Sequence, residues 1–244
     1  LEDEAASGAV IDAAFDAGIN FFDTADVYGD GKSEILLGKA LRGRRNRAVI
    51  ATKFGYTMGS FAGGAKPDYI RSAVEGSLKR LGVDYIDLYF VHWWDFTTPV
   101  EEVQRALDDA VSTGKILHVG LSDVPAWVVA RAQTFHDLRG LVPVTAMQLE
   151  YSLVQRSIER EHLPLAQAHD IGVTAWSPLA GGILTGKYTR GASTNGSKRM
   201  DSMQLQPLDD RNRAIAEAVD KIADEIGVTS SQLALAWMMA RGVV

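Results

Sequence analysis

The sequence predicts an α/β fold in which the strands of a parallel sheet alternate with amphipathic helices. Two observations support this prediction. Short apolar runs alternate with segments whose apolar residues recur at helical spacing, as Ile70, Val74 and Leu78 do. Glycines stand where several of these helical segments would end, and glycine readily adopts the left-handed conformation found there. Alternation of strand and helix implies a parallel sheet with the helices outside it.

The predicted elements cover most of the chain. We expect strands at Asn20–Phe22, Ala48–Thr52, Tyr85–Val91, Leu117–Leu121, Val144–Leu149 and Val173–Trp176. We expect helices at Glu4–Asp16, Ser33–Leu41, Tyr69–Leu81, Val100–Ser112, Pro125–Thr134, Glu161–His169, Asp210–Ile226 and Ser231–Ala240. The glycines expected to end helices are Gly18, Gly82, Gly114, Gly172 and Gly227. Ser33 is the expected N-cap of the second helix.

The number of strands favours a closed barrel over an open sheet. A further strand beginning at Val243 and one upstream of Glu4 would complete eight strands. An open doubly wound sheet would need a G-x-G-x-x-G loop after its first strand, and no such loop stands there. We therefore predict one (β/α)8 TIM-barrel domain over residues 1–244, incomplete at both ends. It lacks the first strand, most of the last strand and the segment after that strand.

Composition narrows the class of protein. The 244 residues are 46% apolar and 23% charged, as in ordinary globular proteins. The net charge of −6 argues against nucleic-acid binding. The chain has no cysteine, which removes disulfides and thiolate chemistry, and its histidines lack metal-ligand spacing. Without a long apolar run or a signal peptide, we expect a cytoplasmic enzyme that binds no membrane and no metal.

Four polar residues stand at or just past the ends of three successive predicted strands. Asp23 and Tyr28 follow the first, Lys53 the second and His92 the third. The carboxyl ends of barrel strands converge on one mouth, where active sites lie. A phenol can donate a proton to an alkoxide, and a nearby ammonium is expected to lower the pKa of that phenol.

Each of these residues also has a structural interpretation. Asp23 could cap a loop, Tyr28 could pack in a turn, and Lys53 could simply end a strand. A lone histidine such as His92 is more often structural than catalytic. Only their joint position on consecutive strand ends favours a set of groups suited to carbonyl reduction.

These residues stand in motifs that resemble the aldo-keto reductase family. The resemblance runs over essentially the whole chain and is carried by Phe22–Ala25, Tyr28–Gly29, Thr52–Lys53 and Val91–His92. It implies a barrel enzyme that reduces aldehydes and ketones with NADP(H), with Tyr28 as general acid. Asp23 and Lys53 would tune that acid, and His92 would orient the small-molecule carbonyl substrate.

Two segments that contain tryptophan indicate one branch of this family. The segments His92–Asp95 and Val124–Trp127 look most like the aryl-alcohol-dehydrogenase-like branch. Trp93 and Trp94 would then line an aromatic substrate pocket. Packing in the core is the alternative for both indoles, and the sequence leaves the choice open.

The resemblance also carries a nicotinamide site over to this chain. Ser122 and Asp123 match residues that hold the nicotinamide amide, although the family usually has Asn at the second position, and Asp lacks the NH2 donor. Gln148 matches another ligand of that amide, and Trp176 matches the aromatic side chain that stacks on the ring.

A glycine-rich segment follows the last complete predicted strand, inside a long loop at Pro178–Leu208. Gly181–Lys187 fits G-x-x-x-x-G-K, but Tyr188 stands where a P-loop needs Ser or Thr. By resemblance the segment lies along the cofactor diphosphate instead. Its expected cofactor-binding residues are Ser177, Pro178, Leu179, Gly181, Gly182, Leu184, Gly186 and Lys187.

Two other functions are compatible with the same fold, because fold does not fix function. A barrel of this kind could bind a nicotinamide nucleotide as a regulatory sensor, or it could be a lyase or isomerase. The family's residues that choose NADPH over NADH would lie after Val244. The oligomeric state is not predicted.

Overall fold

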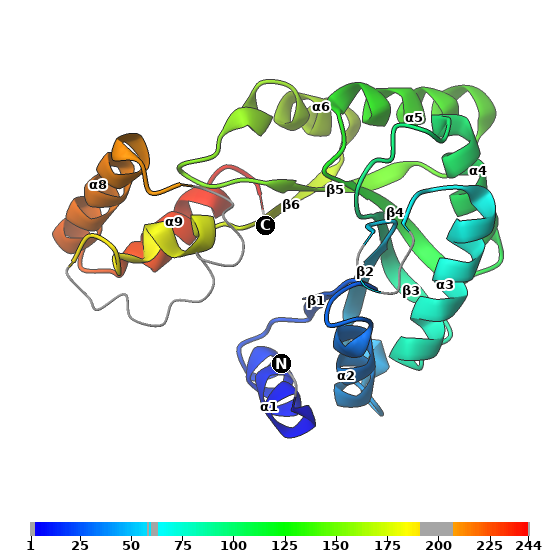
Figure 1. The fold of residues 1–244 in the computed structure, drawn as a ribbon, viewed down its shortest axis with the longest axis horizontal. Coiled ribbons are helices and arrows are strands. Elements are labelled where there is room, and N and C mark those ends of the chain that lie inside the picture. The colour runs from blue at the N-terminus through cyan, green and yellow to red at the C-terminus, as the bar shows by residue number, and fades with distance from the viewer. Residues whose placement is uncertain (1–2, 58, 60–62, 191–206, 244) are drawn as a thin grey trace. The chain divides into compact units, whose positions relative to one another are not determined.

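The computed structural model describes residues 3–57, 59, 63–190 and 207–243 (Figure 1). The strands lie in the sheet in their order along the chain, and the pairs β1–β2, β2–β3 and β3–β4 are parallel. They are β1 Phe21–Asp23, β2 Val49–Phe54, β3 Ile86–Val91, β4 Ile116–Ser122, β5 Val144–Glu150 and β6 Gly172–Trp176. Each matches a predicted strand to within two residues.

Helices alternate with these strands as predicted. They are α1 Glu4–Asp16, α2 Lys32–Ala40, α3 Pro67–Leu81, α4 Val100–Ser112, α5 Ala126–Arg139, α6 His162–His169, α8 Asp210–Ile226 and α9 Ser230–Met239. Three short 3-10 turns were not predicted: η1 Arg45–Arg47, η2 Ser157–Glu159 and η3 Ala180–Thr185. Strand order and helical crossovers confirm the α/β class and the predicted partial (β/α)8 barrel.

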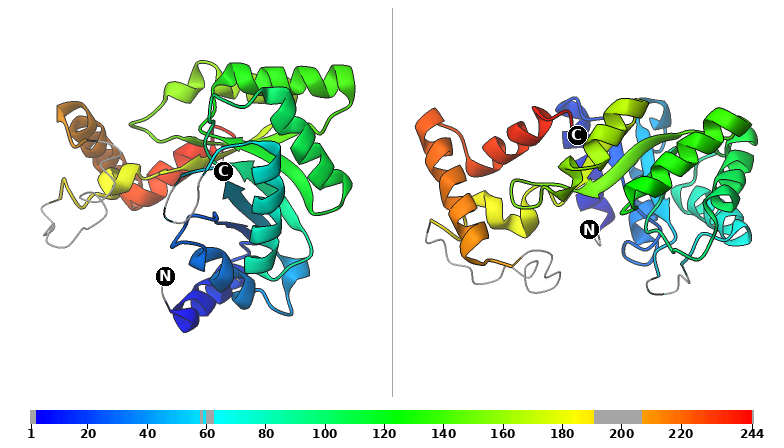
Figure 2. Two further views of the ribbon diagram at one scale, coloured as in Figure 1. Left: turned by 45° about the vertical axis from the view of Figure 1, so that its right-hand side comes forward. Right: turned by 90° about the horizontal axis from the view of Figure 1, so that it is seen from above.

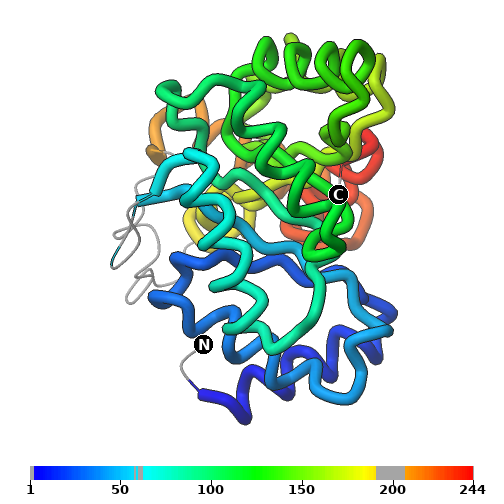
Figure 3. The backbone as a smooth tube through the Cα atoms, turned by 90° about the vertical axis from the view of Figure 1, so that its right-hand side faces the viewer, coloured from blue at the N-terminus to red at the C-terminus, as the bar shows by residue number. Residues whose placement is uncertain are grey.

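The chain divides into two compact units, Leu1–Met147 and Gln148–Val244. The single domain expected from the sequence stays a prediction. In the first unit, α1 to α5 follow one another side by side outside the strands (Figures 2 and 3). Inward-facing residues of β2 and β3 form a buried apolar cluster, with Ala51, Leu88 and Phe90 among its members.

The second unit has a core of its own. η3 packs its apolar side chains against α8 and α9, which lie next to it in Figure 1. Ile183 and Leu184 of η3 are buried together with Ala216 and Val219 of α8 and Ala234 of α9. The glycine-rich segment is therefore held by an apolar contact on one side.

Some local predictions are wrong. Gly172 does not end α6, because Asp170 takes the left-handed conformation there with φ of 54° and its N–H donates to the carbonyl oxygen of Ala166. Aspartate tolerates this conformation better than most residues. Ser33 is not an N-cap: the helix begins after Gly31, and the Ser33 hydroxyl accepts a hydrogen bond from Thr24 at 2.8 Å.

Two further expectations fall at gaps in the described residues. The strand expected from Val243 is not seen at Val243 itself, and the next residue is outside the described part. Of the loop Pro178–Leu208, residues 191–206 also lie outside it. In the part of the chain that the structure describes, no helix is long and apolar enough to cross a membrane.

Gly38 of α2 makes the closest helix contact in the first unit and gives a test of the packing. A Cβ atom at this position would lie 1.9 Å from the carbonyl oxygen of Leu81, at the end of α3. Because the obstacle is backbone, α2 would have to move away from α3. Gly38→Ala should therefore lower the free energy of unfolding by more than about 2 kcal/mol, measured by chemical denaturation.

Gly8→Ala is the matched control, because Gly8 lies inside α1 and a Cβ atom there meets nothing within 4 Å. This variant should be more stable than the unchanged protein by roughly 0.5–1 kcal/mol, since alanine favours a helix interior. Equal effects of the two substitutions would contradict the helix contact.

Candidate active site

The four predicted catalytic residues all lie in the first unit, at the same edge of the sheet. Asp23 is the last residue of β1, Lys53 lies near the end of β2, and His92 directly follows β3. The parallel register pairs Asp23 with Ala51, and Lys53 with Phe90. Lys53 therefore lies two residues beyond the level of Asp23, and His92 two residues beyond the level of Lys53, so the three side chains leave the carboxyl ends of neighbouring strands on the same face of the sheet.

Lys53 is the central group of the site. Its side chain is 0% exposed, and its Nζ donates to Asp23 Oδ2 at 2.5 Å and to the carbonyl oxygen of Thr24 at 2.8 Å. Burial lowers the pKa of Lys53, and the charge and hydrogen bond of Asp23 oppose this shift. A buried ammonium persists only when it is paired in this way.

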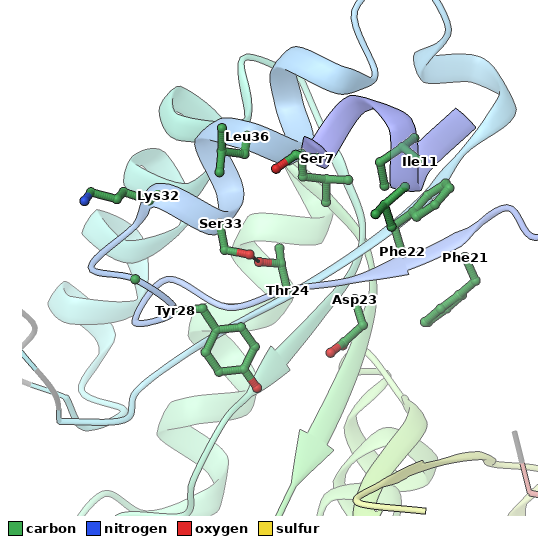
Figure 4. Close-up of a pocket in the computed structure, with 13 residues that line it drawn as sticks. Ser7, Ile11, Phe21, Phe22, Asp23, Thr24, Tyr28, Lys32, Ser33 and Leu36 are labelled. Atoms are coloured by element: carbon green, nitrogen blue, oxygen red, sulfur yellow. Dashed lines mark hydrogen bonds between the residues drawn. The ribbon is translucent and has the colours of Figure 1, made fainter. Parts of the chain in front are cut away.

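Tyr28 lies over this ion pair. The Lys53 Nζ is 5.0 Å from the centroid of the Tyr28 ring. The imidazole of His92 packs edge-on against the same ring, with centroids 5.7 Å apart at 84°. Figure 4 shows the Asp23 carboxylate and the Tyr28 ring on the same side of the chain, while Thr24 points toward Ser33. Tyr28 stays 40% exposed, so part of the residue faces solvent.

The electrostatics of Tyr28 differ from the prediction. Instead of being lowered by Lys53, the pKa of Tyr28 is raised to about 12, first by burial and then by the carboxylates of Asp23, Asp123 and Asp26. The ammonium is already paired with Asp23, and the surrounding acids disfavour a phenolate. Tyr28 therefore keeps its proton near neutral pH, where it is present as a donor, but the raised pKa makes it a weaker acid than a free tyrosine.

His92 is uncharged near neutral pH. Burial, followed by the charge of Lys53, lowers the pKa of His92 to about 4. Its backbone N–H donates to the carbonyl oxygen of Phe54 at 2.7 Å, which fixes the residue beside β2. The buried Nδ1 has no hydrogen-bond partner among the described residues. A neutral imidazole can donate one hydrogen bond to a substrate oxygen.

Aromatic side chains surround His92. Tyr56, which the sequence analysis missed, lies 5.4 Å from the His92 ring and 6.1 Å from the Trp93 ring, measured between centroids. Trp93 is 48% exposed beside it. Trp94 instead is 3% exposed and lines a small cavity with residues of α4, β4 and α5, which favours the packing alternative for this indole.

A cavity of about 670 Å³ opens next to β1 (Figure 4). It is lined by α1, β1, the loop after β1 and α2, and includes Asp23 and Tyr28. Most of its other lining residues, such as Ile11 and Leu36, belong to the helices. The cavity thus adjoins the site along the edge strand.

A second acid, Asp26, lies behind the site and was not singled out from the sequence. Its side chain is 1% exposed and both carboxyl oxygens are buried without a hydrogen-bond partner among the described residues. Burial and the negative charge of Glu34 raise the pKa of Asp26 to about 7, against the opposing charges of Arg80 and Lys53. The only sequence feature that could have indicated Asp26 is its position between Asp23 and Tyr28.

Glu34 connects the elements behind this loop. It is 0% exposed and accepts hydrogen bonds from Thr52 Oγ1 at 2.7 Å and from Arg80 Nε at 2.6 Å. The carboxylate therefore ties α2 to β2 and to α3. The loop that carries Asp23 and Tyr28 is supported by this network.

The predicted cofactor residues of the first unit follow β4. Ser122 is the last residue of the strand and is 2% exposed. Asp123 comes next with φ of 45°, a left-handed conformation that aspartate tolerates. Its carboxylate acts on both Tyr28 and Lys53, so it belongs to the electrostatic surroundings of the site.

The other predicted cofactor residues belong to the second unit. Gln148 lies in β5, and its Nε2 donates to Thr174 Oγ1 at 3.3 Å. Trp176 ends β6, and its carbonyl oxygen accepts from the N–H of Tyr151 at 3.4 Å. Ser177 follows in a left-handed conformation and begins the glycine-rich segment, with Pro178 and Leu179 next along the chain.

The glycine-rich segment fits an anionic group. Gly181, Gly182 and Gly186 all have positive φ, so the segment depends on glycine for its shape. A Cβ atom at Gly182 would lie 2.6 Å from Lys187 Nζ, which folds over it. Residues 177–190 include two cations, Lys187 and Arg190, and no acid. Glycine backbone with Lys187 beside it would suit a dinucleotide diphosphate, whereas Arg190 is paired with Asp220 and Asp224 of α8.

The alternative of a P-loop is not supported. η3 is a 3-10 segment interrupted by non-helical residues rather than the start of an α-helix. Within the described residues, no three His, Asp or Glu side chains gather closely enough to hold a metal ion.

At the carboxyl ends of β1, β2 and β3, the buried Lys53–Asp23 pair, Tyr28 and His92 lie together. Comparison with known proteins gives the family: the model of the aldo/keto reductase family matches residues 2–244, and the chain belongs to this family.

Two relatives illustrate its position in the family. A probable aldo-keto reductase 1 from Glycine max is 41% identical over 239 residues, which cover 96% of this chain and 67% of the relative. A norsolorinic acid reductase from Aspergillus flavus is 35% identical over 247 residues, which cover 97% and 62%. The chain thus spans about two thirds of the length of these relatives.

Asp26 gives a prediction about pH. The folded protein holds a proton on this carboxyl up to about pH 7, whereas the unfolded chain releases it near its ordinary value of 3.8. Stability from this group is therefore present at low pH and is lost as pH rises toward 7. Asp26→Asn removes the titration, so relative to the unchanged protein it should gain about 2–3 kcal/mol of unfolding free energy between pH 5 and pH 8.

Urea denaturation of both proteins at several pH values measures this difference. A difference that is the same at pH 5 and pH 8 would contradict the raised pKa of Asp26, whatever the fixed cost of the substitution.

Proposed function

We propose that this protein reduces aldehydes or ketones to alcohols with NADPH, with Tyr28 as the general acid. The observation that carries the proposal is the buried Lys53 ammonium, held by Asp23 beneath an accessible Tyr28. Family membership supports a nicotinamide-dependent oxidoreductase. The aryl-alcohol-dehydrogenase-like branch and a cytoplasmic location, which cell fractionation would test, are part of the proposal.

When bound, the reduced nicotinamide supplies a hydride to the carbonyl carbon. The residues of this chain then manage the oxygen. As negative charge develops there, the Tyr28 hydroxyl donates its proton, and the uncharged His92 donates a hydrogen bond that orients the carbonyl. Lys53 places a fixed positive charge 5.0 Å from the Tyr28 ring. This charge opposes the carboxylates of Asp23, Asp123 and Asp26, which disfavour the phenolate that proton transfer leaves behind.

By family resemblance, several residues of this chain would hold the cofactor. Ser122, Asp123 and Gln148 would bind the nicotinamide amide, and Trp176 would stack on the ring. The segment with Gly181, Gly182, Leu184, Gly186 and Lys187, preceded by Ser177, Pro178 and Leu179, would receive the diphosphate. Asp123 offers only acceptor oxygens when ionised, so it suits the NH2 group of the amide.

Two other functions remain as alternatives with distinct outcomes. Binding of NADPH without turnover of any carbonyl would favour a nucleotide sensor. Failure to bind any nicotinamide nucleotide would favour a lyase or isomerase on the same fold.

Removal of the Tyr28 hydroxyl tests the role of the general acid. Tyr28→Phe should lower kcat for aldehyde reduction by at least about 100-fold, because the only positioned proton donor is lost, while the Kd for NADPH changes little. Steady-state kinetics and fluorescence titration measure the two quantities.

Tyr85→Phe makes the same chemical change at the start of β3, where the ring stacks against Arg45. It should leave kcat unchanged. Turnover retained by Tyr28→Phe would refute the assignment of the acid.

The aromatic cluster predicts substrate preference. We propose that Tyr56 and Trp93 contact the substrate, since the Tyr56 ring lies between His92 and Trp93 in a chain of ring contacts and both residues are partly exposed. Tyr56→Leu should lower kcat/KM for benzaldehyde about 5- to 10-fold, the size of one lost aromatic contact, and leave butanal within about 2-fold. An equal loss for both aldehydes would show that Tyr56 does not select aromatic substrates.

A further inference from the structure

Asp220 of α8 is a buried carboxylate whose hydrogen bonds join three parts of the second unit. It is 8% exposed. It accepts from Ser230 Oγ of α9 at 2.5 Å and from Thr189 Oγ1, just past the glycine-rich segment. Burial raises the pKa of Asp220, but the hydrogen bonds from Ser230 and Thr189 and the charge of Arg190 outweigh it, so the pKa lies below its usual value. The group is therefore a charged acceptor, which makes strong hydrogen bonds.

Arg190 adds a second connection to α8. Its guanidinium lies 3.5 Å from Asp220 Oδ1 and 2.9 Å from Asp224 Oδ1, measured from Nε and from NH2. It also donates to the carbonyl oxygen of Asp220 at 3.1 Å. Two consecutive residues after the glycine-rich segment thus bind the same turn of α8.

Hydrogen bonds close the turn between the glycine-rich segment and the residues Thr189 and Arg190. The carbonyl oxygen of Gly186 accepts from the backbone N–H of Arg190 at 3.0 Å and from Thr189 Oγ1 at 3.2 Å. Gly186 has φ of 81°, and a Cβ atom there would lie 3.0 Å from Arg190 Nε and 3.2 Å from Asp220 Oδ1. The position of Thr189 and Arg190 therefore fixes where the glycine-rich segment ends.

The segment needs such a fixed end. Its apolar residues Ile183 and Leu184 are held by α8 and α9, but Gly181, Gly182 and Gly186 have no side chain to anchor them. Glycine loses more backbone freedom than any other residue on adopting one conformation. Among the described residues, no ion pair joins Lys187 to a carboxylate, and its ammonium lies 4.7 Å from the Tyr188 ring centroid.

We propose that Asp220 is a positioning residue that, through Thr189 and Arg190, holds the segment 181–187 in the shape that receives the diphosphate of a dinucleotide. This inference rests on the proposed function. The contact set by Asp220 has two halves: Thr189 and Arg190 connect it to the glycine-rich segment, and Ser230 connects it to α9. The two halves can be removed separately.

Thr189→Val removes the hydroxyl contact of the segment half, leaves the contacts of Arg190 in place and keeps the shape of the side chain. Its amides at 181–187 should exchange hydrogen faster in mass spectrometry, because the end of the segment is released. The Kd for NADPH and for ADP-ribose, which carries the diphosphate without the nicotinamide, should both rise about 10-fold. The kcat at saturating NADPH should stay within about 2-fold, since the reacting groups are untouched.

Ser230→Ala is the matched control for the other half, and Thr189→Ser the conservative rescue. Ser230→Ala should lower Tm while leaving the Kd values for NADPH and ADP-ribose unchanged. Thr189→Ser keeps the hydroxyl that Thr189→Val loses, so it should restore both Kd values to those of the unchanged protein. Unchanged amide exchange in Thr189→Val, or faster exchange with unchanged Kd values, would overturn the role of Asp220. If the unchanged protein binds neither nucleotide, the proposed function itself fails, and this inference with it.

Discussion

The burial of one ammonium group, that of Lys53, constrains most of the first unit. A fully buried cation needs hydrogen-bond acceptors from the protein in place of water. The end of β1 and the loop after it provide them. Asp23 and the carbonyl oxygen of Thr24 both face it. The backbone continues the arrangement beyond the strand, because the N–H of Asp26 donates to the carbonyl oxygen of Lys53 at 3.0 Å. These contacts hold the loop against Lys53 and thereby place Tyr28 above the ion pair.

The same arrangement explains why the site holds acids that take no direct part in proton transfer. Glu34 ties α2 to β2 and α3, and Asp26 lies between this network and Lys53. Together with Asp123, these carboxylates make the phenolate of Tyr28 unfavourable in the free protein. A donor that holds its proton until a stronger base forms beside it suits the neutralisation of an alkoxide. Structural support and chemical tuning thus come from the same charges.

Much of the fold and of the candidate site was predictable from the sequence, because apolar periodicity and strand-end positions are local properties. Asp23, Lys53 and His92 were found in this way, and the structure places them together. The failures needed information from three dimensions. The raised pKa of Tyr28 depends on burial and on acids at the end of β1, in the loop after β1 and directly after β4, and Tyr56 is notable only because it packs against His92. At Asp170, a side chain that tolerates the left-handed conformation replaced the expected glycine.

Folding shifts the pKa of Asp26 and the pKa of His92 in opposite directions, and this affects how the stability of the protein depends on pH. Folding raises the pKa of Asp26 to about 7, so the folded state takes up a proton there. It lowers the pKa of His92 to about 4, so the unfolded state takes up a proton at that position instead. Between about pH 4 and pH 6.5 the two uptakes cancel, and their combined contribution to stability does not change with pH. Mild acidification within this range therefore does not shift the folding equilibrium through these two groups.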